Sequence, residues 1–178
     1  MNQSDTSEDI VVRGTGEGHL ATLRFGELRA KCALGAGGIT GQKQEGDKAT
    51  PAGRLALRRL WYRPDREPCP PTGLPVSEIS QNLGWSDDSA DPDYNRLVRL
   101  PHGFGHETLW RDDGLYDLFI ELGWNDAPPQ AGLGSAIFLH LEKNDFQPTL
   151  GCVAIARDTM LALLPQLSTA HFIRIEHA

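Results

Sequence analysis

Apolar and polar residues alternate in the first part of the chain, in residues 10–14 (IVVRG) and again in residues 19–35 (HLATLRFGELRAKCALG). A period of two is typical of strands with one buried face, and glycine suits tight turns, so we expect strands joined by such turns. Residues 35–53 are rich in glycine and polar side chains and cannot form a regular element. They predict a long loop, and a loop of that length is usually functional or mobile.

The middle of the chain combines short apolar runs with a proline-rich stretch. Residues 54–64 (RLALRRLWYRP) are compatible with a strand or a short helix that ends at Pro64. Residues 64–93 contain six prolines and show little periodicity, which predicts an irregular excursion over the surface. The strand pattern then returns in RLVRL at 96–100, LYDLFIELG at 115–123 and SAIFLHL at 135–141.

The C-terminal part of the chain carries the one clear helical pattern. Apolar residues recur at helical spacing within residues 156–167, with Asp158 as the expected N-cap. These apolar residues are Met160, Leu163, Leu164 and Leu167. The alternating FIRIE, residues 172–176, predicts a return to the sheet. The patterns together predict a β-rich α+β fold with one main helix.

Length and composition fit one globular domain. The chain has 178 residues, of which 39% are hydrophobic and 23% are charged, values near the average for folded proteins. We expect a single domain over residues 10–178, preceded by a disordered N-terminus at residues 1–9. The formal charge of −7 indicates no basic surface of the kind that binds phosphate backbones, so nucleic acid is not an expected partner.

The sequence contains neither a basic leader followed by an apolar segment nor a run of about 18 apolar residues, so we expect no export and no membrane partner. The cysteines are too few for a disulfide scaffold, and their odd number leaves at least one free. They are Cys32, Cys69 and Cys152. A reducing cytoplasm fits them best. Nothing in the sequence specifies an oligomeric state.

The segment TLGCV, residues 149–153, places Cys152 after the apolar run SAIFLH, which His140 closes. A thiol performs covalent chemistry only if a base takes its proton and the backbone holds the oxyanion. Taken singly, such a cysteine or histidine is more often a buried core residue. Here the chain can double back and bring the two together, and Gly151 permits a close backbone approach. We expect a pair in which a cationic His140 lowers the pKa of the thiol.

A zinc site is the competing interpretation. HGFGH places His102 and His106 four residues apart, and Glu107, His140 and Cys152 could complete a ligand set. The glycines and the preceding proline disfavour a helix that would put both histidines on one face. The segment GAGGITG lacks the Gly-Lys-Ser/Thr of a phosphate-binding loop. The favoured interpretation therefore has no metal and no cofactor.

The segment HLEKNDFQPTLGCVAI, with its histidine, spacer and Ser/Thr-x-Gly-Cys, resembles the signature of the L,D-transpeptidase catalytic domain, the YkuD-like family. The similarity continues upstream through EGDKATPAG, TGLPV, GWSDD, DPDYNR, HETLWRDDGLYDL, GWND and GSAIFLH, as in a short subgroup without export signals. It covers most of residues 10–178. The resemblance implies a mixed β-sheet fold with one main helix after the catalytic cysteine.

The resemblance also implies roles for particular residues. Cys152 would be the nucleophile and His140 its base, oriented by a backbone carbonyl. The amides of Gly151 and Cys152 would form the oxyanion hole. This chain departs from many members at two positions, having Leu150 in place of histidine and Ala154 in place of arginine or asparagine. These departures affect the expected substrate contacts and leave the Cys–His pair intact.

Members of the family act on the tetrapeptide stem of peptidoglycan and cleave the bond between the L-centre of diaminopimelate and the terminal D-alanine. Such a peptide offers carboxylates, which arginine binds through its planar fork. The expected substrate-binding residues are Thr149, Arg111, His106, Trp110, Arg96 and Arg157. Each arginine can also be a solvated surface residue, and Trp110 a core aromatic residue.

The expected acceptor of the thioester is water, because a chain without an export signal meets soluble muropeptides rather than the cell wall. The sequence thus predicts a cytoplasmic L,D-carboxypeptidase of muropeptide recycling, whose partner is a peptidoglycan-derived tetrapeptide or muropeptide. The alternatives are an L,D-transpeptidase that forms cross-links or exchanges D-amino acids, a zinc-binding protein, and a non-catalytic muropeptide-binding module.

Overall fold

Strands dominate the computed structural model, which describes residues 8–178 of the chain. The large sheet contains β1 (Ile10–Gly14), β2 (Leu20–Phe25), β3 (Leu28–Ala33), β6 (Gly53–Tyr62), β7 (Val76–Glu78), β11 (Leu118–Leu122), β12 (Phe138–Leu141), β13 (Val153–Ile155) and β14 (Phe172–Glu176). A small sheet contains β8 (Leu83–Ser86), β9 (Leu97–Arg99) and β10 (His106–Thr108). The remaining elements are the strand pair β4 (Ile39–Thr40) and β5 (Thr50–Pro51), the helix α1 (Arg157–Leu163) and a 3₁₀ turn (Leu164–Gln166).

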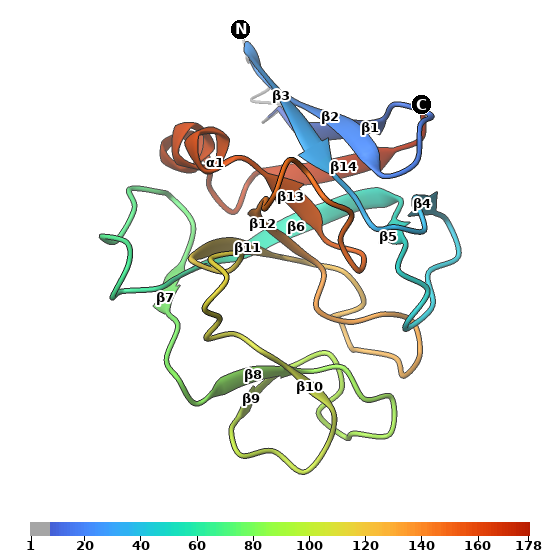
Figure 1. The fold of residues 1–178 in the computed structure, drawn as a ribbon, viewed down its shortest axis with the longest axis vertical. Coiled ribbons are helices and arrows are strands. Elements are labelled where there is room, and N and C mark those ends of the chain that lie inside the picture. The colour runs from blue at the N-terminus through green and yellow to red at the C-terminus, as the bar shows by residue number, and fades with distance from the viewer. Residues whose placement is uncertain (1–7) are drawn as a thin grey trace, which may run out of the picture.

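The large sheet closes on itself. Its strands follow the order β11-β12-β13-β3-β2-β1-β14-β6-β7, and β11 also pairs with β6. The long strand β6 makes this closure possible, because its first half pairs with β14 and its second half pairs with β11. The result is a ring of strands with α1 beside it (Figure 1).

Alternating side chains of the central strands build two apolar clusters on opposite faces. Leu118 and Ile120 of β11 pack into the larger cluster, to which α1 also contributes, whereas Phe119 packs into the second cluster. The second cluster also takes Trp85 from β8, so it joins the large sheet to the small sheet. Because successive strand residues point to opposite faces, one strand serves both clusters.

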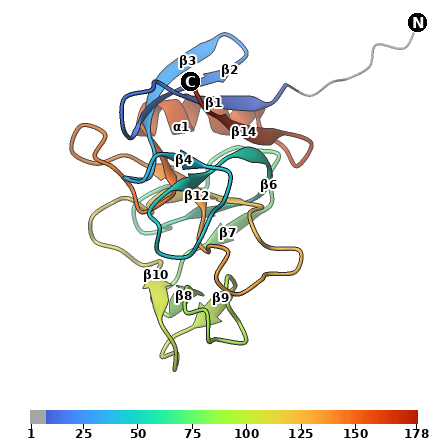
Figure 2. The ribbon, with the colours of Figure 1, turned by 90° about the vertical axis from the view of Figure 1, so that its right-hand side faces the viewer.

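The small sheet belongs to an excursion of the chain between β6 and β11. The excursion begins after Tyr62 and ends before Leu118, and these two residues are direct partners in the large sheet. It carries β7, β8, β9 and β10, and the small sheet extends away from the large one (Figures 1 and 2). The ring of strands therefore closes through β6 and β11 without the excursion, which adds β7 as a further partner of β6.

The sequence predicted the main strands and missed several short ones. Residues 54–64, compatible with strand or helix, form β6. The prediction of an irregular excursion over residues 64–93 was wrong where β7 and β8 form, and the loop at 35–53 contains the short pair β4 and β5. These strands are two to four residues long, and their stability depends on distant partners rather than on a local pattern.

The helix begins one residue before its expected cap. Ala156 is the N-cap and makes no side-chain capping bond, so the assignment of that role to Asp158 was wrong. The chain turns into the helix directly after β13, which leaves Asp158 in the first turn, where its carboxylate faces the positive end of the helix dipole. With 38% strand and 6% helix, the predicted β-rich α+β fold class is confirmed.

The expected disordered N-terminus, residues 1–9, falls largely outside the described residues. Glu8 and Asp9 are described, and they pair with Arg24 and Arg54. The assignment of residues 10–178 to a single domain stays a prediction. Within the described part of the chain, no helix is long and apolar enough to cross a membrane.

Candidate active site

Two neighbouring strands place the expected catalytic pair on one face of the large sheet. β12 and β13 are parallel partners in which His140 lies beside Ala154. Cys152, two residues earlier, therefore lies level with Phe138. Since side chains two residues apart in a strand share a face, His140 and Cys152 point the same way. Both line one cavity of about 770 Å³.

The thiol of Cys152 is buried and neutral. Only 8% of the residue is exposed. The thiol donates to the carbonyl oxygen of Ala136 at 3.1 Å and accepts a hydrogen bond from the Phe138 N–H at 3.3 Å. Burial, together with the nearby charge of Glu107, raises the pKa of the Cys152 thiol to about 12. The resting nucleophile is therefore a thiol rather than a thiolate.

The imidazole of His140 is buried and neutral as well. Its Nδ1 lies 2.8 Å from the carbonyl oxygen of Leu141, which can only accept, so Nδ1 carries the proton and Nε2 keeps a lone pair. Burial lowers the pKa of His140 to about 4. The expectation that a cationic His140 lowers the pKa of Cys152 was therefore wrong, because desolvation disfavours the charged form of both groups.

The turn before Cys152 is held by Thr149. The Thr149 hydroxyl donates to the carbonyl oxygen of Cys152 at 2.7 Å and accepts from the Gly151 N–H at 3.0 Å. Gly151 has φ of +139°, and a Cβ there would lie 3.0 Å from the Ala49 carbonyl oxygen, so only glycine fits. Among the described residues, none accepts a hydrogen bond from the Cys152 N–H. The Gly151 amide is already bonded, and the Cys152 amide is available to an oxyanion.

Tyr116 and Glu107 lie next to this pair. The ring of Tyr116 packs edge-on against His140, with 5.4 Å between ring centroids, and its hydroxyl donates to Glu107. Burial raises the pKa of the Glu107 carboxyl, while the hydrogen bond from Tyr116 opposes that shift. Sequence reasoning considered Glu107 only as a zinc ligand and missed Tyr116. No local signal marks this contact, because it depends on the pairing of separate segments.

Asn95 connects the small sheet to the wall of the site. Its Oδ1 accepts from the indole N–H of Trp85 and from the Ala136 N–H, each at 3.0 Å. Its Nδ2 donates to the carbonyl oxygens of Trp124 and Asn125. Ala136 has φ of +52°, a conformation uncommon for a residue with a Cβ, and this bond to Asn95 helps to hold it there. Asn95, a residue of the segment between β6 and β11, thus helps to fix Ala136, whose carbonyl oxygen accepts a hydrogen bond from the Cys152 thiol.

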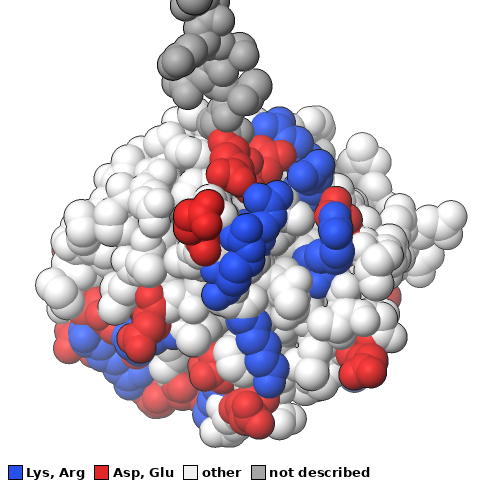
Figure 3. All heavy atoms as spheres, turned by 90° about the horizontal axis from the view of Figure 1, so that it is seen from above, with Lys and Arg blue, Asp and Glu red and all other residues white. Residues whose placement is uncertain are grey.

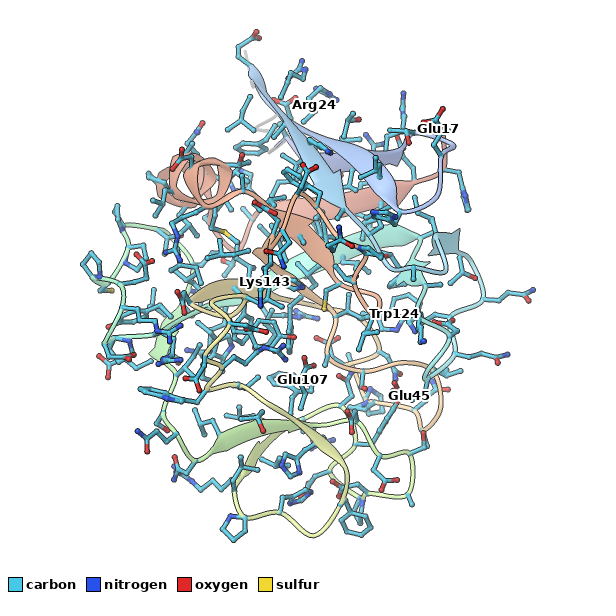
Figure 4. All side chains as sticks on the ribbon, in the orientation of Figure 1. Glu17, Arg24, Glu45, Glu107, Trp124 and Lys143 are labelled. Atoms are coloured by element: carbon cyan, nitrogen blue, oxygen red, sulfur yellow. The ribbon has the colours of Figure 1, made fainter. Side chains whose placement is uncertain are left out.

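Charged side chains of both signs line the cavity. The carboxylates are Glu45, Asp87 and Glu107, and the cations are Lys48, Arg111 and Lys143. Figure 4 shows Lys143 on the loop after β12, above Glu107 on the small sheet. Glu45 accepts hydrogen bonds from Tyr94 at 2.5 Å and Ser135 at 2.6 Å, and burial with the charge of Glu45 raises the pKa of Asp87. The cavity can thus bind a ligand that carries both charges.

Five of the nine expected site residues line this cavity, and four do not. The lining residues are Cys152, His140, Thr149, Arg111 and His106. Gly151 lies behind them in the turn. Arg111 is already engaged, because its guanidinium binds Asp113 through two hydrogen bonds and lies 3.7 Å from Glu107.

Trp110, Arg96 and Arg157 do not line the cavity, and their expected role in substrate binding stays a prediction. Trp110 packs beneath the guanidinium of Arg63, 3.6 Å from the ring centroid. Arg96 is exposed beside the small sheet. Arg157 forms ion pairs with Glu67 and Asp117 at the start of α1. The sequence shows the residue types but not the partners of Trp110 and Arg157, which come from distant segments.

The residues of the zinc alternative are dispersed or otherwise bonded. His102 Nε2 lies 2.5 Å from an oxygen of Asp91, and His106 Nδ1 lies 2.9 Å from the carbonyl oxygen of Phe104. Within residues 8–178 no three side chains of His, Cys, Asp or Glu gather as metal ligands would.

Comparison with known proteins supplies the family. A family model described as the L,D-transpeptidase catalytic domain, YkuD, matches residues 9–175. Searches of curated proteins and of solved structures returned no match. The matched range includes the strands that carry His140 and Cys152 and the whole excursion between β6 and β11. The chain therefore belongs to the L,D-transpeptidase catalytic-domain family, whose cysteine catalysis acts on peptidoglycan stem peptides.

Proposed function

We propose that this chain is an L,D-carboxypeptidase that removes the terminal D-alanine from peptidoglycan stem tetrapeptides, and that it serves muropeptide recycling in the cytoplasm. One observation carries the proposal: Cys152 and His140 line a single cavity of about 770 Å³, within the range of pockets that enclose small ligands. The mixed charge of the lining suits a peptide end that carries both ammonium and carboxylate groups.

The acylation step uses the neutral pair. The thiol proton moves from Sγ to Nε2 of His140 while Sγ bonds to the carbonyl carbon of diaminopimelate, and the oxyanion accepts a hydrogen bond from the Cys152 N–H. Nε2 then gives this proton to the amine of D-alanine as the C–N bond breaks. Because Nδ1 stays bonded to the Leu141 carbonyl oxygen, the imidazole keeps its orientation throughout. The products are a thioester and free D-alanine.

Water then attacks the thioester, and His140 takes its proton and returns it to Sγ as the C–S bond breaks. Transfer to an amine requires a second peptide held beside the acyl-enzyme, which positions its amine and raises its effective concentration. Soluble muropeptides in the cytoplasm offer no dense array of such amines, whereas water is always present. Hydrolysis is therefore the expected fate of the acyl-enzyme.

The test is to incubate the protein with the disaccharide tetrapeptide and follow the products by mass. We expect tripeptide and D-alanine in equal amounts, and no product with Cys152→Ala. His140→Ala should lose at least about 100-fold in kcat, the lower range for removal of a general acid–base group. Cross-linked dimers or D-amino-acid exchange as the main products would contradict hydrolysis. Fractionation of cells with an antibody tests the cytoplasmic location.

A further inference from the structure

The cations that line the cavity differ in whether they already have an acidic partner. Arg111 is neutralised by Asp113 and Glu107. Lys48 and Lys143 form no ion pair with any residue in the described range 8–178. An unpaired cation in the cavity that Cys152 lines is available to an anionic ligand.

Most cations elsewhere in the described chain do have partners. On the face that Figure 3 shows, lysine and arginine side chains lie next to acidic ones. Elsewhere in the described chain, Arg24 pairs with Glu8, and Arg54 pairs with Asp9. The unpaired lysines of the cavity therefore stand apart from this general pattern of paired charge.

The backbone at Lys48 is unusual for a residue with a side chain. Its φ is +57°, a region in which glycine is favoured and other residues are uncommon. The carbonyl oxygen of Lys48 accepts from the Gly37 N–H at 2.8 Å, and the next amide, that of Ala49, donates to Asp47 at 2.8 Å. The surroundings thus impose this conformation on lysine, although glycine would adopt it more easily. Strain of this kind points to a use for the side chain.

Lys48 also lies against the turn that carries the nucleophile. A Cβ placed on Gly35 would lie 2.2 Å from the Lys48 carbonyl oxygen and 3.0 Å from the Gly151 Cα. The Lys48 and Gly151 backbones therefore both approach Gly35 closely. The Lys48 side chain starts near this turn and lines the same cavity as Cys152.

We propose that Lys48 forms a carboxylate-binding subsite that holds the free C-terminal carboxylate of the peptide, next to the bond that Cys152 attacks. This inference rests on the proposed function, and it names the group that selects a terminal residue. A carboxylate is repelled by Glu45, Asp87 and Glu107, and Arg111 is already paired, so its position is beside a lysine that lacks an acid. Lys143 adds a second positive charge to the same cavity.

The test compares the free tetrapeptide with its C-terminal amide, which removes only the negative charge. For Lys48→Met we expect kcat/KM on the free acid to fall about 10- to 100-fold, the range for loss of a charged hydrogen bond, with little change on the amide. Lys48→Arg should retain most of the preference for the acid. Arg96→Met removes an exposed cation outside the cavity and should change neither substrate. Equal losses on acid and amide with Lys48→Met would overturn the inference.

Two further measurements separate this inference from the proposed function. Binding of both peptides to Cys152→Ala, with and without Lys48→Met, reports the subsite without turnover, so it stays informative even if no hydrolysis occurs. There we expect Lys48→Met to weaken binding of the acid alone. Lys48→Gly should raise the Tm while it lowers kcat/KM on the free acid, because glycine relieves the backbone and removes the charge. A Lys48→Gly variant with unchanged selectivity for the acid would show that the side chain has no such role.

Discussion

At the scale of single residues, burial determines the charge of the catalytic pair. Desolvation raises the pKa of Cys152 to about 12 and lowers that of His140 to about 4, so both are neutral near pH 7. When both groups are neutral, the thiol proton must move to His140 during the attack. In this structure the thiol instead donates a hydrogen bond to the carbonyl oxygen of Ala136. Substrate binding must therefore redirect that proton towards Nε2 of His140.

Alkylation of the cysteines tests this charge state. At pH 7 we expect iodoacetamide to label the exposed Cys69 well before Cys152, because Cys152 is buried and almost entirely protonated. The rate at Cys152 should rise about tenfold per pH unit for as long as the fold survives, since only the thiolate reacts. Peptide mapping by mass spectrometry gives both rates. Labelling of Cys152 before Cys69 at pH 7 would contradict a neutral thiol.

The sequence motif identified Cys152, His140 and Gly151, because their types and spacing are local. It could not predict the protonation state, since the burial of Cys152 comes from the cluster that contains Trp85 and Phe119, two residues far away in the chain. The expectation that arginine binds the substrate carboxylates stays a prediction. The sequence could not show that Arg111 and Arg157 have acidic partners, because these ion pairs form only in the folded chain.

At the scale of elements, the excursion between β6 and β11 is joined to the rest of the molecule by the apolar cluster around Trp85, by the pairing of β7 with β6 and by side-chain hydrogen bonds. Asn95 makes such hydrogen bonds to Trp124, Asn125 and Ala136. Alternation predicted the long strands, but it could not predict this contact, since side-chain bonds across segments leave no periodic pattern. The short strands of the excursion were missed because each is stable only beside its partner.

Asn95→Asp keeps the shape and removes the two amide N–H donors. We expect the free energy of unfolding to fall by about 2–4 kcal/mol, since two carbonyl oxygens lose their partner and a charge is introduced at a buried position. Asn144→Asp is the matched control, because Asn144 also has a positive φ but is exposed. Urea unfolding of the three proteins provides the measurement. Equal stability of the two variants would show that Asn95 does not connect the sheets energetically.

Arg157 connects α1 to the excursion through Glu67 and Asp117. Its guanidinium is partly exposed, and Asp117 keeps a second partner in Arg66 at 3.0 Å. For Arg157→Met we therefore expect a loss of about 1 kcal/mol or less in the free energy of unfolding. Because Arg157 lies outside the cavity, kcat/KM should not change. A large increase in KM with unchanged stability would restore this residue to substrate binding.

At the scale of the whole molecule, the buried histidine makes stability depend on pH. The pKa of His140 is about 4 in the folded chain and near 6.5 in the unfolded chain, so the unfolded chain binds more protons between these values. The contribution of neutral His140 to the free energy of unfolding is therefore fully present above about pH 6.5, and it is lost as the pH falls towards 4.

Urea unfolding at pH 7 and pH 4.5 tests this dependence. His140 alone should lower the free energy of unfolding by about 2–3 kcal/mol between these two conditions. His140→Gln cannot titrate, so its stability should fall by that much less over the same interval. The difference between the two proteins isolates His140 from the carboxyl groups that titrate in the same range. Equal pH dependence in both would show that His140 is not held neutral by the fold.

The direct pairing of Tyr62 with Leu118 has a consequence for how such a protein can diversify. The two ends of the excursion meet as neighbouring residues of a finished sheet, so a different segment can be inserted there without altering the register of β6 and β11. The proposed base lies on β12 and the proposed nucleophile directly precedes β13, outside the insertion, whereas Asp87, His106 and Glu107 lie within it. The insertion also supplies Trp85, Asn95 and Tyr116, which bury Cys152, hold Ala136 and pack on His140. A replacement segment that keeps these three contacts would change what the enzyme recognises, which makes the Tyr62–Leu118 junction a graft point for redesign.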